Sequence, residues 1–363
     1  MTDRVGIGVV GAGVISTQYL DTLTRAADVD VRFVADLDPA RARARATEFG
    51  VPDGGTVEAL LADDAIEIVV NLTVPAAHVE VALRALAAGR HVWNEKPIAP
   101  DRTGARAVLD AARTAGLRVA AAPDTLLGPG FQAALRLVAD GAVGTPISAL
   151  TLLQTPGPEH WHPDPAFLFQ DGAGPLLDMG PYYLTALVQL LGPVVGVQAL
   201  GSRARAERTV GSGPRAGQRF AVTVPTQVSA LYRFAGGASA QSLFSFDSPR
   251  VRRRFELTGT EGTLVVPDPN TFIGAPEIHR AGGEVHRLAR TATTAGRGTG
   301  VVELARAVRD GRPERASGEL AYHVLDTMLA TLEAAESGAA VAVASTAPPV
   351  PPLPDGWDPL AAG

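Results

Sequence analysis

Short apolar segments alternate with longer amphipathic segments over the first 122 residues, and this alternation limits the possible folds more than any other feature of the sequence. The apolar segments predict strands at residues 5–10, 31–35, 66–72, 91–94 and 119–122. The segments between them have the length and the apolar spacing of helices. Strands joined by such helices form right-handed βαβ units, so the sequence predicts a doubly wound parallel sheet.

After Pro123 the pattern changes to closely spaced strands, which we expect at residues 147–153, 194–200, 220–234, 238–246, 255–259 and 263–266. Short connections between alternating strands favour an antiparallel sheet. We therefore predict an α/β Rossmann domain at 1–122, followed by an α+β domain with an open-faced, mainly antiparallel sheet at 123–345. A proline-rich tail at 346–363 should run extended over the surface.

The charge and composition of the chain exclude several classes of function. Its formal net charge is −6, so no basic surface is expected for nucleic acid. The sequence has no cysteine, which excludes disulfides and thiolate chemistry. No apolar run is long enough to span a membrane, and Asp3 and Arg4 lead directly into the first strand without a signal peptide. We therefore expect a cytoplasmic protein that binds neither nucleic acid nor a membrane.

A glycine-rich turn joins the first predicted strand to the first helix. Gly11 permits the tight turn, and Gly13 leaves room for a pyrophosphate to approach the backbone. The N-terminus of the helix then offers N–H groups and the positive end of its dipole. Ser16 stands where a third glycine is usual, and it is still small enough for close packing. The turn predicts a dinucleotide site, although a tight turn without a ligand could carry the same glycines.

An acidic residue ends the second predicted strand. The Asp36 carboxylate can accept hydrogen bonds from both hydroxyls of an adenosine ribose, and it would repel a 2′-phosphate. The sequence therefore favours NAD over NADP. Two alternatives remain open. Asp36 could only cap the next helix, and Arg41 or Arg43 on that helix could bind a phosphate, although Asp38 adds a second negative charge there.

The chain has 32 lysines and arginines, and Lys96 is the only lysine among them. Arginine stays protonated in proteins, whereas a buried lysine can lose its proton and act as an acid or a base. A sequence that uses arginine at every other cationic position has retained lysine here. We therefore interpret Lys96 as a residue for proton transfer, and the alternative is a surface lysine without a special role.

Four segments resemble one family in their order and spacing. They are the glycine turn at 11–15, Thr-Val-Pro-Ala-Ala-His at 73–78, Glu-Lys-Pro at 95–97 and a glycine-rich segment at 172–182. Together they resemble the glucose–fructose oxidoreductase / inositol dehydrogenase / rhizopine catabolism (Gfo/Idh/MocA) family of NAD(P)-dependent oxidoreductases. The resemblance extends to about Gly338, and it implies a Rossmann domain, a substrate domain with an open sheet and an NAD cofactor.

The resemblance also assigns residues to the cofactor. In such enzymes the Glu-Lys-Pro turn lies at the nicotinamide, with Glu95 at its ribose, and Pro97 often follows a cis peptide bond. Asn71 and Thr73 end a strand that contacts the adenosine ribose and the phosphates, whereas His78 is either part of this site or only a cap or packing residue. The expected cofactor-binding residues are Gly11, Gly13, Val14, Ile15, Asp36, Asn71, Thr73, Pro75, His78, Glu95 and Lys96.

The same resemblance implies the catalytic residues. Relatives usually carry Asp-x-Gly-x-His, whose Asp and His bind substrate hydroxyls. Here tyrosine replaces the histidine, as in the glucose–fructose oxidoreductase and dihydrodiol dehydrogenase branches, and a phenol can also donate to or accept from a sugar oxygen. The expected catalytic residues are Lys96, Asp178 and Tyr182, and we interpret the neighbouring Tyr183 as a packing residue.

Three further residues are expected near the substrate. Trp161 and His162 occupy the segment where relatives often carry Trp-Arg, and Asp124 follows the fifth strand, where the two domains should meet. Asp124 could instead only cap a turn. The spacing of His160, His162 and Asp164 would suit a metal ion, but hydride transfer to NAD already supplies the electrophile, so we expect no metal.

These residues predict an NAD-dependent oxidoreductase that oxidises a secondary hydroxyl of a sugar, glycoside or cyclitol by hydride transfer to the nicotinamide, while Lys96 and Tyr182 handle the proton. Two alternatives remain open. A glycoside-cleaving member of the family would use NAD in an internal cycle of oxidation, elimination, hydration and reduction, and a non-catalytic protein would only sense the dinucleotide. Relatives normally cover the exposed sheet face with a second subunit, so we expect a homodimer or homotetramer.

Overall fold

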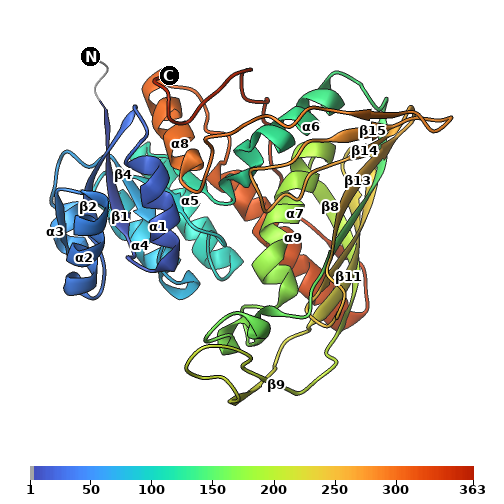
Figure 1. Ribbon diagram of the computed structural model, residues 1–363, viewed down its shortest axis with the longest axis horizontal. Helices are drawn as coiled ribbons and strands as arrows, with labels where there is room; N and C mark the ends of the chain where they lie inside the picture. The colour runs from blue at the N-terminus through green and yellow to red at the C-terminus, as the bar shows by residue number, and fades with distance from the viewer. Residues whose placement is uncertain (1–3) are drawn as a thin grey trace. The chain divides into compact units, whose positions relative to one another are not determined.

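The computed structural model describes residues 4–363, and the chain divides into two compact units (Figure 1). The first unit contains the chain up to Pro129 together with Ala292–Leu325 and Val350–Gly363. The second contains Gly130–Thr291 and Asp326–Pro349. The sequence indicated three consecutive ranges with boundaries after residues 122 and 345, whereas two C-terminal segments of the chain return to the first unit.

The first unit contains a parallel sheet of six strands in the order β3-β2-β1-β4-β5-β6. One of them, β3 (Asp53–Gly55), was not predicted, because Asp-Gly-Gly carries no apolar pattern. The strand order reverses between β1 and β4, and sheets of this kind bind ligands at the carboxyl ends of the strands beside such a reversal. The predicted strands are confirmed as β1 (Val5–Val10), β2 (Val29–Ala35), β4 (Ile68–Asn71), β5 (His91–Asn94) and β6 (Val119–Ala121).

Helices connect these strands. Asp38 caps α2 (Pro39–Phe49) by accepting hydrogen bonds from the amides of Ala40 and Arg41, and Pro39 occupies the first helical position, as predicted. One further helix, α8 (Thr299–Asp310), comes from the C-terminal part of the chain and packs against α1; the sequence analysis assigned no helix there. The remaining helices are α1 (Val14–Leu23), α3 (Val57–Leu61), η1 (Pro75–Ala77), α4 (His78–Ala87), α5 (Arg102–Ala115) and η2 (Asp124–Leu127).

The second unit is built on a mixed sheet in the order β16-β15-β14-β13-β7-β12-β11-β8-β17. β7 and β12 pair in parallel, and the other neighbouring strands pair antiparallel, so the predicted fold class is confirmed. The strands are β7 (Pro146–Gln154), β8 (Val194–Ser202), β11 (Gln227–Phe234), β12 (Ser239–Ser245), β13 (Arg252–Gly259), β14 (Thr263–Val265), β15 (Glu277–His279), β16 (Val285–Arg287) and β17 (Val341–Ala342).

The predicted strand 220–234 is two strands. Its first part is β10 (Arg219–Ala221), which pairs with β9 (Glu207–Thr209) in a separate hairpin, and its second part is β11. Pro225 lies between them and has no amide hydrogen for a sheet hydrogen bond, so the ladder cannot continue through it.

The remaining helices of the chain are α6 (Pro129–Ala139), η3 (Pro158–His160), η4 (Ala166–Phe169), α7 (Pro175–Leu191) and α9 (Gly318–Ser337).

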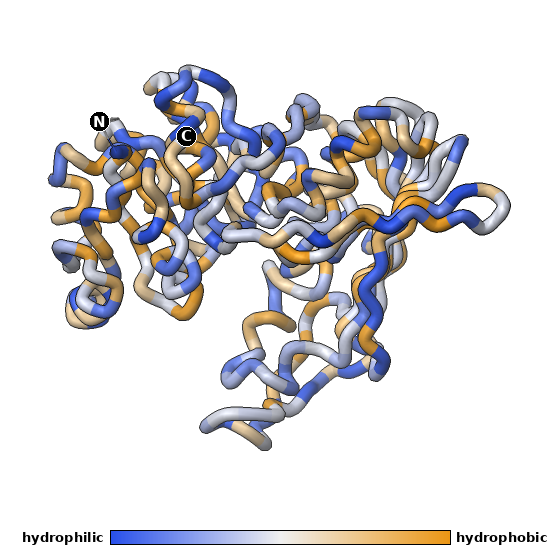
Figure 2. The backbone as a smooth tube through the Cα atoms, turned by 45° about the horizontal axis from the view of Figure 1, so that its top comes forward, coloured by the Kyte–Doolittle hydropathy of each residue, from blue (hydrophilic) through white to orange (hydrophobic). Residues whose placement is uncertain are grey.

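The sheet of the second unit has one buried and one exposed face. In β11 the side chains of Val228, Ala230 and Tyr232 are buried, and those of Ser229 and Leu231 between them are exposed. Figure 2, coloured by hydropathy, shows hydrophobic and hydrophilic residues interspersed along the backbone of the sheet strands. The buried face packs against α7, which contacts β7, β11 and β12. The opposite face is therefore the open face that the sequence predicted.

The proline-rich segment 348–354 forms no helix or strand, in agreement with the sequence prediction. Among residues 4–363, no helix combines the length and the hydrophobicity that are needed to cross a membrane.

Candidate active site

The glycine turn lies between β1 and α1. Gly11 has a φ angle of +103°, and a Cβ atom there would lie 2.7 Å from the Leu72 carbonyl oxygen, so only glycine fits. Gly13 is the N-cap of α1, and nothing lies within 4 Å of the position that its Cβ would take. Ser16 is buried and donates a hydrogen bond to the Gly13 carbonyl oxygen at 2.7 Å. The turn is therefore rigid, and it leaves open space at a helix N-terminus, where a pyrophosphate can bind.

Asp36 directly follows β2 and is 7% exposed. Its Oδ2 accepts a hydrogen bond from the Ala12 amide at 2.8 Å, and its Oδ1 accepts from the Asp38 amide at 2.9 Å and from the Arg41 guanidinium. Burial alone would raise the pKa of this carboxyl, but the hydrogen bonds from Arg41 and the two amides outweigh burial and lower the pKa. Asp36 is therefore ionised beside the glycine turn, and the cap of α2 is Asp38 instead.

Three apolar side chains are exposed just after the ends of β1, β2 and β4. Val14, Leu37 and Val74 are 88%, 98% and 67% exposed, and Ile15 next to Val14 is half-buried. Apolar side chains gathered at one edge of a sheet indicate a surface that an apolar group covers, and an adenine ring is such a group. The sequence analysis missed Leu37 and Val74. The available signal was an apolar residue directly after each of two candidate cofactor residues, since Leu37 follows Asp36 and Val74 follows Thr73.

Asn71 ends β4 and joins several groups inside the first unit. Its Nδ2 donates to Asn94 Oδ1 at 2.8 Å and to the His78 carbonyl oxygen at 3.1 Å. Its Oδ1 accepts from the Thr73 hydroxyl at 2.7 Å and from the Thr73 amide at 3.3 Å. Asn71 and Asn94 are fully buried. The carboxyl ends of β4 and β5 are therefore joined by hydrogen bonds within the protein.

His78 begins α4 and is fully buried. Its Nδ1 lies 2.6 Å from the Pro97 carbonyl oxygen, and its Nε2 lies 3.0 Å from the Thr73 carbonyl oxygen. A neutral imidazole has a single N–H, so it can donate to only one of these oxygens at a time. Burial lowers the pKa of His78, although both carbonyl groups act in the opposite direction. These contacts fit the packing role that the sequence analysis considered, because His78 links Thr73 to the turn at 95–97.

The turn of Glu95, Lys96 and Pro97 follows β5, and the Lys96–Pro97 peptide bond is cis, as expected. Glu95 Oε1 accepts from the Tyr19 hydroxyl at 2.8 Å, and Glu95 Oε2 accepts from the Lys96 amide at 2.9 Å. The Tyr19 oxygen in turn lies 3.1 Å from the indole nitrogen of Trp93, which donates to it. The sequence analysis did not select Tyr19 or Trp93. Lys96 itself is half-buried and has hydrogen-bonding or electrostatic partners in the protein.

Asp124 is fully buried at the start of η2. Its Oδ2 accepts from the Gly298 amide at 2.7 Å, and its Oδ1 accepts from Arg297 at 3.2 Å. Burial raises the pKa of Asp124, and the nearby Glu95 carboxylate adds to this effect, whereas Arg297 and the Gly298 amide lower the pKa. Gly298 is the N-cap of α8, so Asp124 holds the beginning of that helix. A capping role is the alternative that the sequence left open for this residue.

In the second unit, Asp178 lies in the first turn of α7, and Tyr182 follows one turn later. Residues four apart lie on the same side of a helix, so both side chains project in a similar direction. Asp178 is half-buried and Tyr182 is 8% exposed. The Tyr183 ring packs edge-on against Phe244 at 5.8 Å between ring centroids, so Tyr183 is a packing residue, as predicted.

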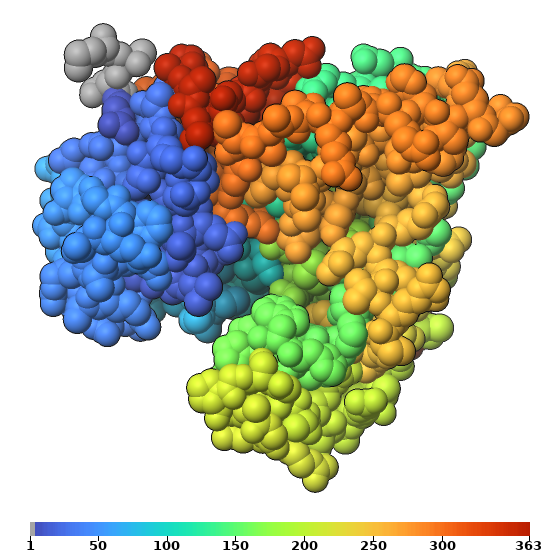
Figure 3. All heavy atoms as spheres, in the orientation of Figure 1, coloured from blue at the N-terminus to red at the C-terminus, as the bar shows by residue number. Residues whose placement is uncertain are grey.

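Trp161 and His162 lie in the loop after η3, beside the β9–β10 hairpin (Figure 3, green and yellow-green). Trp161 is 69% exposed, and the ring centroid of His162 lies 5.5 Å from those of Trp161 and Phe167. The buried Arg208 of β9 binds the Glu159 carboxylate and so attaches this loop to the hairpin. Within residues 4–363, no three acidic or histidine side chains are arranged to hold a metal ion.

The first unit fits a bound dinucleotide. The space beside Gly13 suits the pyrophosphate, and the ionised Asp36 can accept hydrogen bonds from the adenosine ribose. The exposed side chains of Leu37 and Val74 can cover the adenine ring. These features lie just beyond the carboxyl ends of β1, β2 and β4, where the strand order reverses.

Comparison with known proteins supports this assignment. Residues 5–122 match the model of an oxidoreductase family with an NAD-binding Rossmann fold, and residues 131–265 match the GFO/IDH/MocA C-terminal domain. The chain is 28% identical over 342 residues to D-xylose 1-dehydrogenase (NADP(+)) 2 of Haloferax volcanii, covering 92% of this chain and 98% of that protein. It is 32% identical over 289 residues to dTDP-3,4-didehydro-2,6-dideoxy-alpha-D-glucose 3-reductase of Streptomyces antibioticus, covering 78% and 81%.

Among solved structures, a levoglucosan dehydrogenase in complex with NADH and L-sorbose superposes with a TM-score of 0.80 at 21% sequence identity, over 94% of this chain and 99% of that one. At this identity, the likeness shows a common fold.

Proposed function

This chain belongs to the Gfo/Idh/MocA family of NAD-binding oxidoreductases, and on that premise we propose that it oxidises a secondary hydroxyl of a sugar, glycoside or cyclitol. One observation carries the proposal. The only lysine of the chain lies in the turn after β5, in the same parallel-sheet unit as the glycine turn and Asp36. An amine in this position can take a proton from a hydroxyl, whereas a guanidinium cannot.

In this proposal each residue has one role. When bound, NAD supplies the acceptor for the hydride that leaves the substrate carbon. Lys96 takes the proton of the reacting hydroxyl through its Nζ atom. Asp178 binds a substrate hydroxyl from the first turn of α7, Tyr182 one turn later shares the handling of the proton with Lys96, and Trp161 and His162 are further substrate contacts. We assign Asp124 to the support of α8, because both of its carboxylate oxygens already accept hydrogen bonds within the protein.

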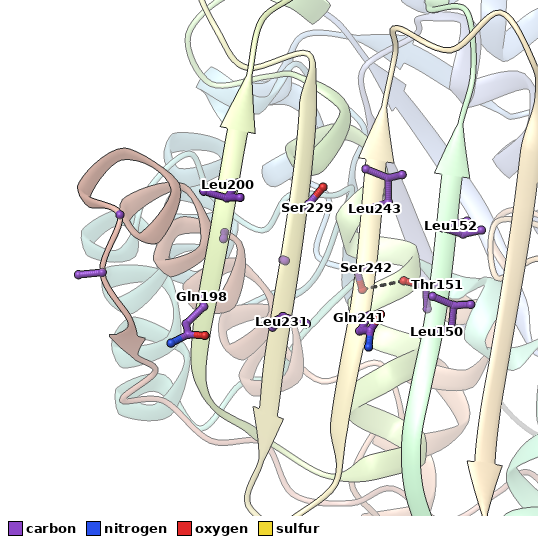
Figure 4. Close-up of a pocket in the computed structure, with 14 residues that line it drawn as sticks. Leu150, Thr151, Leu152, Gln198, Leu200, Ser229, Leu231, Gln241, Ser242 and Leu243 are labelled. Atoms are coloured by element: carbon purple, nitrogen blue, oxygen red, sulfur yellow. Dashed lines mark hydrogen bonds between the residues drawn. The ribbon is translucent and has the colours of Figure 1, made fainter.

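We further propose that a second copy of this chain covers the open face of the sheet in the second unit. Leu150, Leu200 and Leu231 are exposed on this face, and together with Leu152 and Leu243 they line a shallow pocket across β7, β8, β11 and β12 (Figure 4). Polar side chains alternate with the leucines, since Leu231 lies between Gln198 and Gln241 in the strand register. A face of mixed leucines and amides suits contact between copies, and we infer a dimeric or tetrameric enzyme.

Incubation of the purified protein with NAD and a panel of sugars, cyclitols and glycosides tests the proposed function. NADH should accumulate with at least one polyol, and a Lys96→Arg variant should not produce it. Cleavage of a glycoside without net NADH would favour the internal redox cycle instead, and no turnover with any member of the panel would favour a dinucleotide sensor.

The proposed contact between copies is tested by comparing the sedimentation coefficients of Leu231→Glu and the wild type. A charge buried at the interface should release monomers.

A further inference from the structure

We propose that Tyr19 is a positioning residue for Lys96. Its hydroxyl holds the Glu95 carboxylate, and that carboxylate holds the backbone amide of Lys96. The inference rests on the proposed function of Lys96 and adds to it a residue of α1 that lies 76 positions before Glu95 in the sequence.

The chemistry of the groups fixes the direction of each hydrogen bond. An indole nitrogen can only donate, so Trp93 donates to the Tyr19 oxygen at 3.1 Å. A phenol has one proton, and Tyr19 donates it to Glu95 Oε1 at 2.8 Å. The Lys96 amide donates to Glu95 Oε2 at 2.9 Å. Because each carboxylate oxygen has its own donor, the Glu95 side chain is held from two sides.

Burial makes this arrangement rigid. Tyr19 and Trp93 are both fully buried, so water cannot easily replace either partner. A Cβ atom on Gly300 would lie 2.0 Å from the Trp93 ring, which means that α8 packs directly on the indole. Burial, together with the Glu95 and Asp124 carboxylates, raises the pKa of Tyr19 well above its ordinary value. Tyr19 therefore keeps its proton and remains a donor to Glu95.

Loss of the Tyr19 hydroxyl should free one side of the carboxylate. Glu95 would then be held mainly through the Lys96 amide, and the backbone at Lys96 would lose a fixed acceptor. Small displacements of a reacting group are costly, since about 1 Å can reduce the rate on the order of a hundredfold. We expect Tyr19→Phe to lower kcat roughly tenfold, because the freed Glu95 carboxylate no longer fixes the backbone of Lys96.

The single lysine provides a direct measurement. In protein labelled with [15N]lysine, the backbone spectrum contains one signal, that of the Lys96 amide. In Tyr19→Phe this amide proton should move upfield and exchange faster with solvent, because its hydrogen bond to Glu95 is weaker. Tyr232→Phe is the matched control, since Tyr232 is a buried tyrosine of the second unit whose hydroxyl lies 3.3 Å from Thr331. An unchanged signal in Tyr19→Phe would overturn the inference.

Kinetics of Tyr19→Phe, Glu95→Gln and the double variant provide the second test. If Tyr19 acts through Glu95, the double variant should lose no more kcat than Glu95→Gln alone. Multiplied losses in the double variant would overturn the inference, because Tyr19 would then act independently of Glu95. Should Tyr19→Phe fail to fold, Glu95→Gln in the labelled protein tests the bond to the amide. A wild type that oxidises no substrate, but whose amide signal responds as expected, would contradict the proposed function and leave the positioning of Lys96 supported.

Discussion

The two ends of the candidate cofactor site differ in how the protein holds them. At the predicted nicotinamide end, the turn at 95–97 is attached to Asn71, His78 and Asn94, all of which are fully buried. At the adenosine end, Leu37 is almost fully exposed, and Asp36 is paired with Arg41, whose side chain is 56% exposed. Buried side chains therefore fix the predicted nicotinamide end, whereas at the adenosine end the buried Asp36 lies beside an exposed leucine and an exposed arginine. Changes at the first end should alter rate or stability, and changes at the second should alter affinity and selectivity.

Replacement of Lys96 should have the largest effect on kcat, and it tests whether the predicted nicotinamide end controls the rate. Lys96→Arg keeps the positive charge but cannot release a proton near neutral pH, so kcat should fall by roughly a thousandfold, within the usual range for loss of an acid–base group. The dissociation constant of NADH, measured by fluorescence, should stay within about threefold of the wild type, because the adenosine end is untouched.

Lys96→Met serves as the control for charge. It should lose about as much activity as Lys96→Arg, since both lack a group that can exchange a proton. Retention of more than about a tenth of the wild-type kcat by Lys96→Arg would contradict the proton-transfer role. Failure of both variants to bind NADH would mean that Lys96 mainly holds the cofactor.

Asn71→Leu should have the next largest effect, on stability. It removes the partner of Asn94 Oδ1, of the His78 carbonyl oxygen and of the Thr73 amide, all close to the fully buried Asn71. A buried polar group left without a partner costs about 1–3 kcal/mol, and we expect the free energy of unfolding to fall by about 3 kcal/mol in urea denaturation. The exposed Gln18→Leu is the matched control and should change it by less than about 0.5 kcal/mol. Equal effects of the two changes would mean that the buried amide of Asn71 contributes no more to stability than an exposed amide does.

Asp36→Ser should change cofactor selectivity. Removal of the carboxylate removes the charge that repels a 2′-phosphate, so the ratio of NADPH to NADH affinity should rise roughly tenfold, while kcat with NAD stays within about threefold.

Arg41→Ala should shift cofactor selectivity the other way, toward NAD. It leaves the Asp36 carboxylate without its guanidinium partner, so preference for NAD should increase. A rise of NADPH affinity in Arg41→Ala would show that this interpretation of the pair is wrong.

The smallest effect concerns the pH dependence of stability at the buried end. Burial lowers the pKa of His78 in the folded protein, so the unfolded chain takes up its proton at a higher pH than the folded chain does. The contribution of His78 is therefore fully present above the ordinary histidine pKa of about 6.5 and is lost as the pH falls below it. His78→Gln should reduce the slope of unfolding free energy against pH in this range. An unchanged slope would mean that His78 does not titrate on unfolding.

Sequence reasoning succeeded where the determining interactions are local. The strands β1, β2 and β4 to β6, the tight turn at Gly11 and the cap at Asp38 each depend on neighbouring residues, so their signals are visible in a single chain. The single lysine was visible for the same reason. The fold class also followed from the spacing of these local signals.

The missed features depend on residues that are distant in the sequence. The bond from Tyr19 to Glu95 spans 76 positions, and the bond from Gly298 to Asp124 spans 174. No local pattern marks Tyr19 or Gly298 as the partner of these acids, because a tyrosine that donates to a carboxylate looks in the sequence like any other core tyrosine. The strand β3 was missed for a different reason, since Asp-Gly-Gly pairs through its backbone and has no side-chain pattern.

The discontinuous first unit has a consequence for synthesis of the chain. The Ala27 amide donates to the Leu360 carbonyl oxygen at 3.3 Å, and Arg306 binds Asp28 at 2.7 Å while its guanidinium lies 4.9 Å from the Trp357 ring centroid. The nascent N-terminal half leaves the ribosome without these partners. The dinucleotide-binding unit, although its sheet is encoded before the second unit, can therefore be completed only after the second unit has been translated and Val350–Gly363 has followed it.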